Sequence, residues 1–110
     1  ESRHPEWAEA SADKLGSLMP GAGHMVHMPS HIYMRLGRYA DSYDANLLAS
    51  QADEDYITQC NAQGLYPLAY YPHNVHFLAW SAMLQGRKQA AMEASRKVAD
   101  QVPADFVFAP

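Results

Sequence analysis

A gapless internal repeat constrains the fold of this chain more than any other feature of its sequence. Residues 23–46, GHMVHMPSHIYMRLGRYADSYDAN, align with residues 72–95, PHNVHFLAWSAMLQGRKQAAMEAS, at an offset of 49 positions. The matching pairs are His24 with His73, Val26 with Val75, His27 with His76, Met34 with Met83, Arg38 with Arg87 and Ala45 with Ala94. Such a repeat predicts stacked helical units that bury a core only between neighbours.

Helix-forming patterns and helix-ending residues alternate along the whole chain. Apolar residues recur at helical spacing, and a proline or glycine stands at or near the ends of the runs. Because Pro29 lacks an N–H group, a helix must start or kink near Met28. We therefore expect an all-α domain of antiparallel helices joined by short turns. The expected helices run from Pro5 to about Leu18, from Pro29 to Gly37, from Tyr39 to about Ala62, from Asn74 to Gly86 and from Lys88 to about Val102.

Composition excludes several classes of protein. A chain of 110 residues with 48% hydrophobic and 18% charged residues is typical of one globular domain. The net charge of −4, without a run of Lys or Arg, argues against a nucleic-acid partner. We also expect no membrane insertion, because no apolar run is long enough to span a bilayer. Cys60 is the single cysteine, so the sequence predicts no internal disulfide and leaves the cellular compartment open.

The segment Leu36–Ser50, LGRYADSYDANLLAS, resembles the turn and second helix of the tetratricopeptide repeat family. Other residues fall on the family's motif positions: Tyr33, Leu78, Ala79, Ala91 and Pro103, with Ala8 and Pro20 in the matching places of an earlier unit. The resemblance implies a right-handed superhelical array of about two and a half helix pairs, cut from a longer bacterial-type protein. The departures are Pro29 and Ser30 for a Leu-Gly pair, Ser42 and Asn46 for Ala and an aromatic residue, and a 49-residue period instead of 34.

This resemblance divides a single domain, residues 1–110, into four parts. Residues 1–20 would be the second helix of a preceding repeat, 23–53 and 73–103 would be repeats, and 54–72 would be an insertion. We expect the insertion to lengthen one helix and to add an aromatic loop containing Tyr66, Tyr70 and Tyr71. The acidic run Asp53, Glu54 and Asp55 is expected to form a solvated helix face. The first helix lacks its partner, so its apolar stripe, Trp7, Leu15 and Leu18, favours self-association.

The resemblance to this family implies a non-enzymatic scaffold that binds a protein or peptide in a concave groove. Arg35 would be available for a carboxylate on that ligand. The residues expected to face the groove are His24, His27, His31, Met34, Arg35, His73, His76, Trp80 and Met83.

Paired His-x-x-His motifs support an alternative, a metal-binding helical protein. His24, His27, His73 and His76 would converge if equivalent helices run side by side, and imidazole binds zinc, nickel and copper. Methionine sulfur from Met25 or Met28 would add affinity for Cu(I). The competing interpretation is that these histidines are ordinary groove or core residues. The sequence contains no recognised enzyme motif. A third hypothesis is a metal-dependent hydrolase that uses the histidines together with Glu1, Glu6 or Asp41 as the base.

Overall fold

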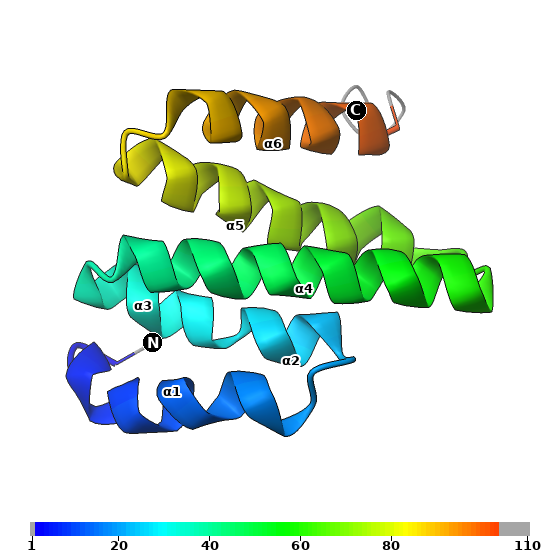
Figure 1. Cartoon of the computed structure of the whole chain (residues 1–110). Helices are drawn as coiled ribbons and strands as arrows, with labels where there is room; N and C mark the ends of the chain where they lie inside the picture. The colour runs from blue at the N-terminus through cyan, green and yellow to red at the C-terminus, as the bar shows by residue number, and fades with distance from the viewer. Residues whose placement is uncertain (1, 104–110) are drawn as a thin grey trace.

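The computed structural model describes residues 2–103, and every regular element in that range is a helix (Figure 1). The all-α prediction is confirmed. In chain order the elements are η1 (Pro5–Ala8), α1 (Glu9–Leu18), α2 (Gly23–His27), α3 (Pro29–Leu36), α4 (Tyr39–Cys60), η2 (Tyr66–Tyr70), α5 (Tyr71–Leu84) and α6 (Lys88–Gln101). The first element is a 3-10 helix, and η2 is a π-helical turn that leads directly into α5. None of the helices within residues 2–103 is both long and apolar enough to cross a membrane.

Equivalent turns follow α3 and α5, one turn in each of the two repeated segments. Gly37 and Gly86 adopt φ angles of 74° and 69°, a left-handed conformation that glycine reaches without a steric penalty. After each glycine, an arginine N–H donates to a carbonyl five residues earlier, Arg38 to Tyr33 and Arg87 to Ala82, both at 2.9 Å. This hydrogen bond is typical of a Schellman closure and satisfies a carbonyl at the helix end.

The predicted break near Met28 is confirmed. Helix α2 ends at His27 and α3 begins at Pro29, where the missing N–H costs nothing because the first N–H groups of a helix have no intrahelical partner. The chain stays helical through the junction, since the Met28 N–H donates to the His24 carbonyl at 3.1 Å. His24 and His27 therefore belong to one short helix and His31 to the next.

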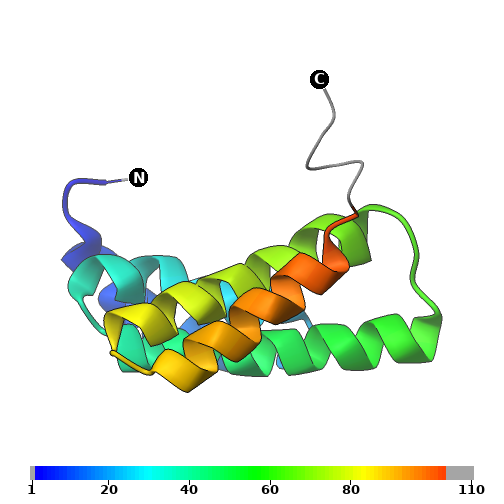
Figure 2. The same cartoon turned by 90° about the horizontal axis from the view of Figure 1, so that it is seen from above.

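Each helix packs mainly on its neighbours in the chain. α1 lies on α2 and α3, these two lie on α4, α4 lies on α5, and α5 lies on α6 (Figure 1). The apolar core between α5 and its neighbours consists of Tyr71, Val75, Leu78, Ala79 and Ala94, with Tyr43, Ile57 and Val98 packed against it. α4 extends beyond the other helices at its C-terminal end, where the chain turns back toward α5 (Figures 1 and 2).

The interpretation of the acidic run as a solvated face is wrong for Asp53. Its side chain is completely buried, because η2 and the start of α5 pack over this part of α4. Glu54 is partly buried and forms an ion pair with Lys97 while accepting a hydrogen bond from the Tyr71 hydroxyl at 2.6 Å. Only Asp55 is exposed as expected. The aromatic segment that we expected as a loop includes the π-helical turn Tyr66–Tyr70.

Candidate metal centre

Three histidines from three helices lie close together. His27 ends α2, His31 lies in the first turn of α3, and His73 lies in the first turn of α5. One ring nitrogen from each of these residues lies within 4.8 Å of the others. His27 is completely buried, whereas His31 and His73 are partly exposed, so the cluster lies at the edge of the interior.

The local sequence explains why these rings meet. His27 and His31 are four residues apart across the Pro29 junction, and the chain is helical on both sides, so they lie on one face. His73 and Phe77 have the same spacing on α5 and face them. The ring centroid of His27 is 4.8 Å from that of His73 and 4.9 Å from that of Phe77. Phe77 also contacts the rings of His31 and His73, so it forms an apolar wall beside the three imidazoles.

Asn46 of α4 determines which nitrogen of His27 carries the proton. The Asn46 Nδ2 donates to the Ser42 carbonyl at 2.7 Å, which leaves Oδ1 as the atom that faces His27. Oδ1 lies 2.6 Å from His27 Nδ1. Because an amide oxygen accepts only, Nδ1 must be the protonated nitrogen and the donor. In the neutral ring, the lone pair on Nε2 then points away from Asn46 toward the other histidines.

That lone pair faces His31. The Nε2 atoms of His27 and His31 are 2.9 Å apart, so without a metal His31 donates its Nε2 proton to His27. In the other neutral tautomer of His31, with the proton on Nδ1, the Nε2 atoms of both rings would offer lone pairs to one ion. A tetrahedral zinc ion with Zn–N bonds of about 2.0–2.1 Å holds its nitrogens about 3.3 Å apart, so only a small adjustment of the two rings is needed.

The electrostatic environment keeps His27 and His73 neutral. Burial lowers the pKa of His27 to about 4; the hydrogen bond with Asn46 acts in the opposite direction, and the neighbouring His31, His73 and His24 lower it further. Burial also lowers the pKa of His73, and His31, His76 and His24 add to this effect. A neutral imidazole is the form that binds a metal ion, so both rings are ready for coordination near pH 7.

Of the four histidines expected to converge, the structure brings His27 and His73 together and adds His31. The ring of His24 packs against Tyr70, with its centroid 6.0 Å from that of His27. His76 is exposed, because Phe77 and not His76 occupies the α5 position that faces His27. The ligand set that the geometry supports is therefore His27, His31 and His73, with His24 nearby and His76 outside.

The other expected groove residues lie in different places. Met34 packs between α3 and α5, where its sulfur accepts a hydrogen bond from Ser81 at 3.5 Å. Arg35 is exposed and its Nη1 donates to the Ser2 carbonyl. His76, Trp80 and Met83 line a hollow together with Ser95 of α6. His31 and Arg35 line a separate hollow between α1 and α3.

Neither Glu6 nor Asp41, two of the three candidate hydrolytic bases, belongs to the cluster. Glu6 is exposed and lies 3.0 Å from His4, and Asp41 is exposed and bonded to Arg38 at 2.7 Å. Glu1 lies outside the described residues. The described part of the chain thus gives the hydrolase hypothesis no support from these residues.

Sequence reasoning missed the role of Asn46. This residue is completely buried and holds His27, yet it lies on a different helix and has no motif spacing to the histidines. One signal was present, because Asn46 stands where the tetratricopeptide pattern has an aromatic residue. A polar residue at a core position requires a hydrogen-bonding partner.

Comparison with known proteins adds no assignment. No family model, no curated protein and no solved structure matches the chain. The function is therefore inferred from the residues and their geometry.

The depressed pKa of His27 predicts a specific pH dependence of stability. The unfolded chain binds a proton at His27 near pH 6.5 and the folded chain only near pH 4, so stability falls as the pH is lowered through this window. With a chelator present, we expect His27 to contribute a loss of about 3 kcal/mol between pH 7 and pH 4.

Urea unfolding of the wild type and of His27→Gln measures this contribution. Glutamine keeps an N–H donor for Asn46 but does not titrate. The wild type should lose more unfolding free energy than the variant over this range. Equal losses in both proteins would contradict the assignment of a buried neutral His27.

Proposed function

We propose that this chain is a metal-binding helical protein that holds one transition-metal ion with His27, His31 and His73. The observation that supports the proposal is the approach of three ring nitrogens within 4.8 Å of one another. Histidine is a common ligand for zinc, copper and nickel, and the cluster contains no carboxylate or thiolate. Cys60 is exposed at the end of α4 and takes no part in it.

The surroundings of the cluster support this function. Metal-bound histidines usually donate their second N–H to a protein group, which fixes the ring and its tautomer. Asn46 takes this role for His27. Three protein ligands leave a fourth position for water or another small ligand, which is typical of exchangeable and catalytic zinc sites. Structural zinc sites usually have four protein ligands.

Titration of Zn²⁺ into tag-free protein at pH 7.5 tests the proposal. We expect one ion per chain with a dissociation constant below about 100 µM, equivalent to at least 5–6 kcal/mol. His31→Ala and His73→Ala should each weaken binding at least roughly tenfold, and the double variant should be little worse than either one because both ligands belong to one site.

His76→Ala is the matched control, because His76 lies on the same helix as His73 but is exposed outside the cluster. Its affinity should equal that of the wild type. Weaker binding than about 100 µM by the wild type, or an equal loss in His76→Ala and His73→Ala, would contradict the proposed site.

A second candidate function is a tetratricopeptide-like scaffold for a partner protein. Three observations favour it: consecutive helices pack on their neighbours, equivalent closures follow Gly37 and Gly86, and the ring of His27 contacts that of His73. The last contact joins α2 to α5, the helices with which the two repeated segments begin. We propose that the stack is a right-handed array of about two and a half such units.

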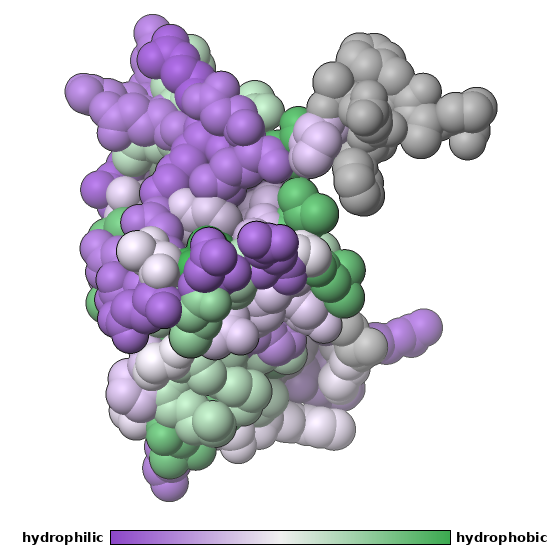
Figure 3. All heavy atoms as spheres, turned by 90° about the vertical axis from the view of Figure 1, so that its right-hand side faces the viewer, coloured by the Kyte–Doolittle hydropathy of each residue, from purple (hydrophilic) through white to green (hydrophobic). Residues whose placement is uncertain are grey.

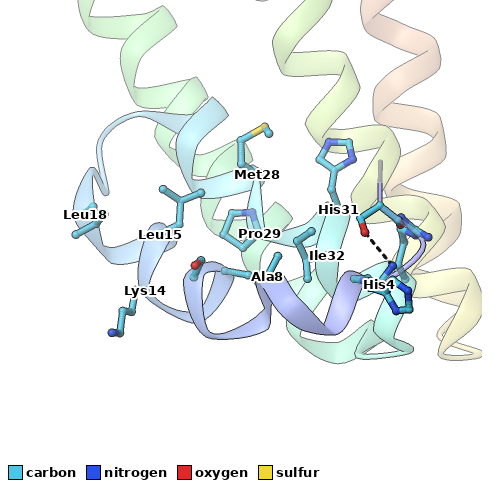
Figure 4. Close-up of a pocket in the computed structure, with 14 residues that line it drawn as sticks. His4, Ala8, Lys14, Leu15, Leu18, Met28, Pro29, His31 and Ile32 are labelled. Carbon is cyan, nitrogen blue, oxygen red and sulfur yellow. Dashed lines mark hydrogen bonds between the residues drawn. The ribbon is translucent and has the colours of Figure 1, made fainter.

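The described surface carries an apolar groove that fits this second function. It lies between η1–α1 and α3 and has a volume of about 780 Å³ (Figure 4). Its walls include Leu15, Leu18, Met28, Pro29 and Ile32. Trp7 is 76% exposed and Leu18 70% exposed. Figure 3 shows the end of the molecule that lies to the right in Figure 1; it is mainly hydrophilic over its upper part, where α6 lies, and more apolar over its lower part.

We expect this groove to cause self-association of the isolated chain, because exposed apolar area is buried when two copies meet. Sedimentation velocity should show mass increasing with concentration for the wild type, and Leu18→Glu should remain monomeric. Leu84→Glu, at a 45% exposed leucine of α5, is the control and should associate like the wild type. A strictly monomeric wild type, or equal effects of the two substitutions, would contradict this use of the groove.

A further inference from the structure

Asp53 is a buried carboxylate that the cluster itself does not use. Its side chain is completely buried on α4, and among residues 2–103 no lysine, arginine or histidine forms an ion pair with it. Burial raises the pKa of Asp53, which shows that the surroundings disfavour its charge. Since an apolar residue of similar volume is often at least as stabilising at such a position, packing alone gives no reason for a carboxylate.

Both oxygens of Asp53 are bound to the segment that carries His73. Oδ2 accepts a hydrogen bond from Asn74 Nδ2 at 2.7 Å, and Oδ1 accepts one from the Tyr66 hydroxyl at 2.5 Å. Asn74 directly follows His73, and Tyr66 opens the π-helical turn that leads into α5. The carboxylate thus fixes the first turn of α5, from which His73 projects.

The same carboxylate lies against the helix that carries His27. A Cβ atom added to Gly23, the first residue of α2, would overlap Asp53 Oδ1 and would lie 2.7 Å from the Ala49 carbonyl oxygen. Only glycine allows α2 to approach α4 this closely. His27 lies one helical turn after Gly23, so Asp53 contacts both helices within about one turn of a proposed ligand.

We propose that Asp53 is a positioning residue for the metal site. Its hydrogen bonds fix the first turn of α5, and its packing against Gly23 sets how closely α2 approaches, so that His27 and His73 lie at a separation at which they can share an ion. This inference rests on the proposed metal-binding function. Asp53 contacts no metal ligand through a hydrogen bond of its own, and acts through Gly23 on one side and Asn74 on the other.

Zinc affinity and ring proximity test this proposal together. Asp53→Ala removes both hydrogen bonds and should weaken zinc binding roughly tenfold, the scale of an outer partner of a metal ligand. It should also weaken the nuclear Overhauser effect between the ring protons of His27 and His73, whose centroids are 4.8 Å apart, in zinc-free protein. Tyr66→Phe removes one of the two bonds, retains the volume, and should cause a smaller loss of the same kind.

Asp53→Asn is the conservative variant that separates hydrogen bonding from charge. The introduced amide can hold both partners, because Asn74 Oδ1 has no partner in the described structure and the Asn74 amide can turn over. This variant should therefore keep affinity and ring proximity close to those of the wild type. If Asp53→Asn and Asp53→Ala lose affinity equally while both keep the His27–His73 contact, charge and not position is responsible and the proposal is overturned.

Two controls separate positioning from general stability. Val98→Ala loosens the packing of α6 against α5 and should lower the melting temperature without changing zinc affinity. Tyr56→Phe changes a 44% exposed tyrosine that contacts Tyr66 and should change neither.

The ring contact distinguishes failure of this inference from failure of the metal function. If the wild type binds no zinc, the proposed function fails, and the His27–His73 contact still tests Asp53. Loss of that contact in Asp53→Ala but not in Val98→Ala supports positioning. The positioning role of Asp53 is overturned if Asp53→Ala and Tyr66→Phe both keep a His27–His73 contact as strong as that of the wild type. It is also overturned if both variants bind zinc as tightly as the wild type.

Discussion

The hydrogen bond between His27 and Asn46 is the interaction on which the rest of the site depends. It joins a completely buried imidazole to a completely buried amide at 2.6 Å, and the amide is itself fixed by the Ser42 carbonyl. This chain of two bonds determines the tautomer of His27 and directs its free nitrogen toward His31 and His73. Without it, Nδ1 of this buried ring would keep only the longer contact with the Ser30 hydroxyl at 3.3 Å, which can donate or accept and so would not fix the tautomer.

The buried side of α4 carries further polar side chains that need hydrogen-bonding partners. Its completely or nearly completely buried residues are Ser42, Asn46, Ala49, Ser50 and Asp53, which follow one another at helical spacing. A helix that serves only as part of a core would carry leucine or isoleucine at such positions. Here Asn46 holds a ring, and Asp53, two turns later, holds the first turn of α5 and contacts the start of α2. This stripe thus connects two of the three elements that supply the histidines, α2 and α5.

Local signals made the helices predictable. Pro29, Gly37 and Gly86 act through their own backbone chemistry, so the breaks and turns that they cause are readable without the fold. Trp7 and Leu18 are exposed, as expected for the apolar stripe of the first helix, whereas Leu15 is partly buried.

The membership of the site was only partly predictable, because it depends on how helices rotate against each other. From sequence spacing alone, the pair His24 and His27 and the pair His73 and His76 were equally good candidates for metal ligands. The structure selects His31 instead of His24 and His76, since Phe77 occupies the α5 position facing His27. Asp53 was misread for a similar reason. An acidic run on a helix is usually solvated, and nothing local to the run shows that Tyr66 and Asn74 will cover one of its members.

The protonation state of the His27 ring tests the central claim most directly. Long-range proton–nitrogen NMR correlations of zinc-free protein at pH 7 distinguish the two neutral tautomers and the charged ring. The structure predicts a neutral His27 with its proton on Nδ1, and a shift of the Nε2 resonance when Zn²⁺ is added while the Nδ1 proton remains. A proton on His27 Nε2, a charged ring at this pH, or a His27 resonance that does not respond to zinc would contradict the account.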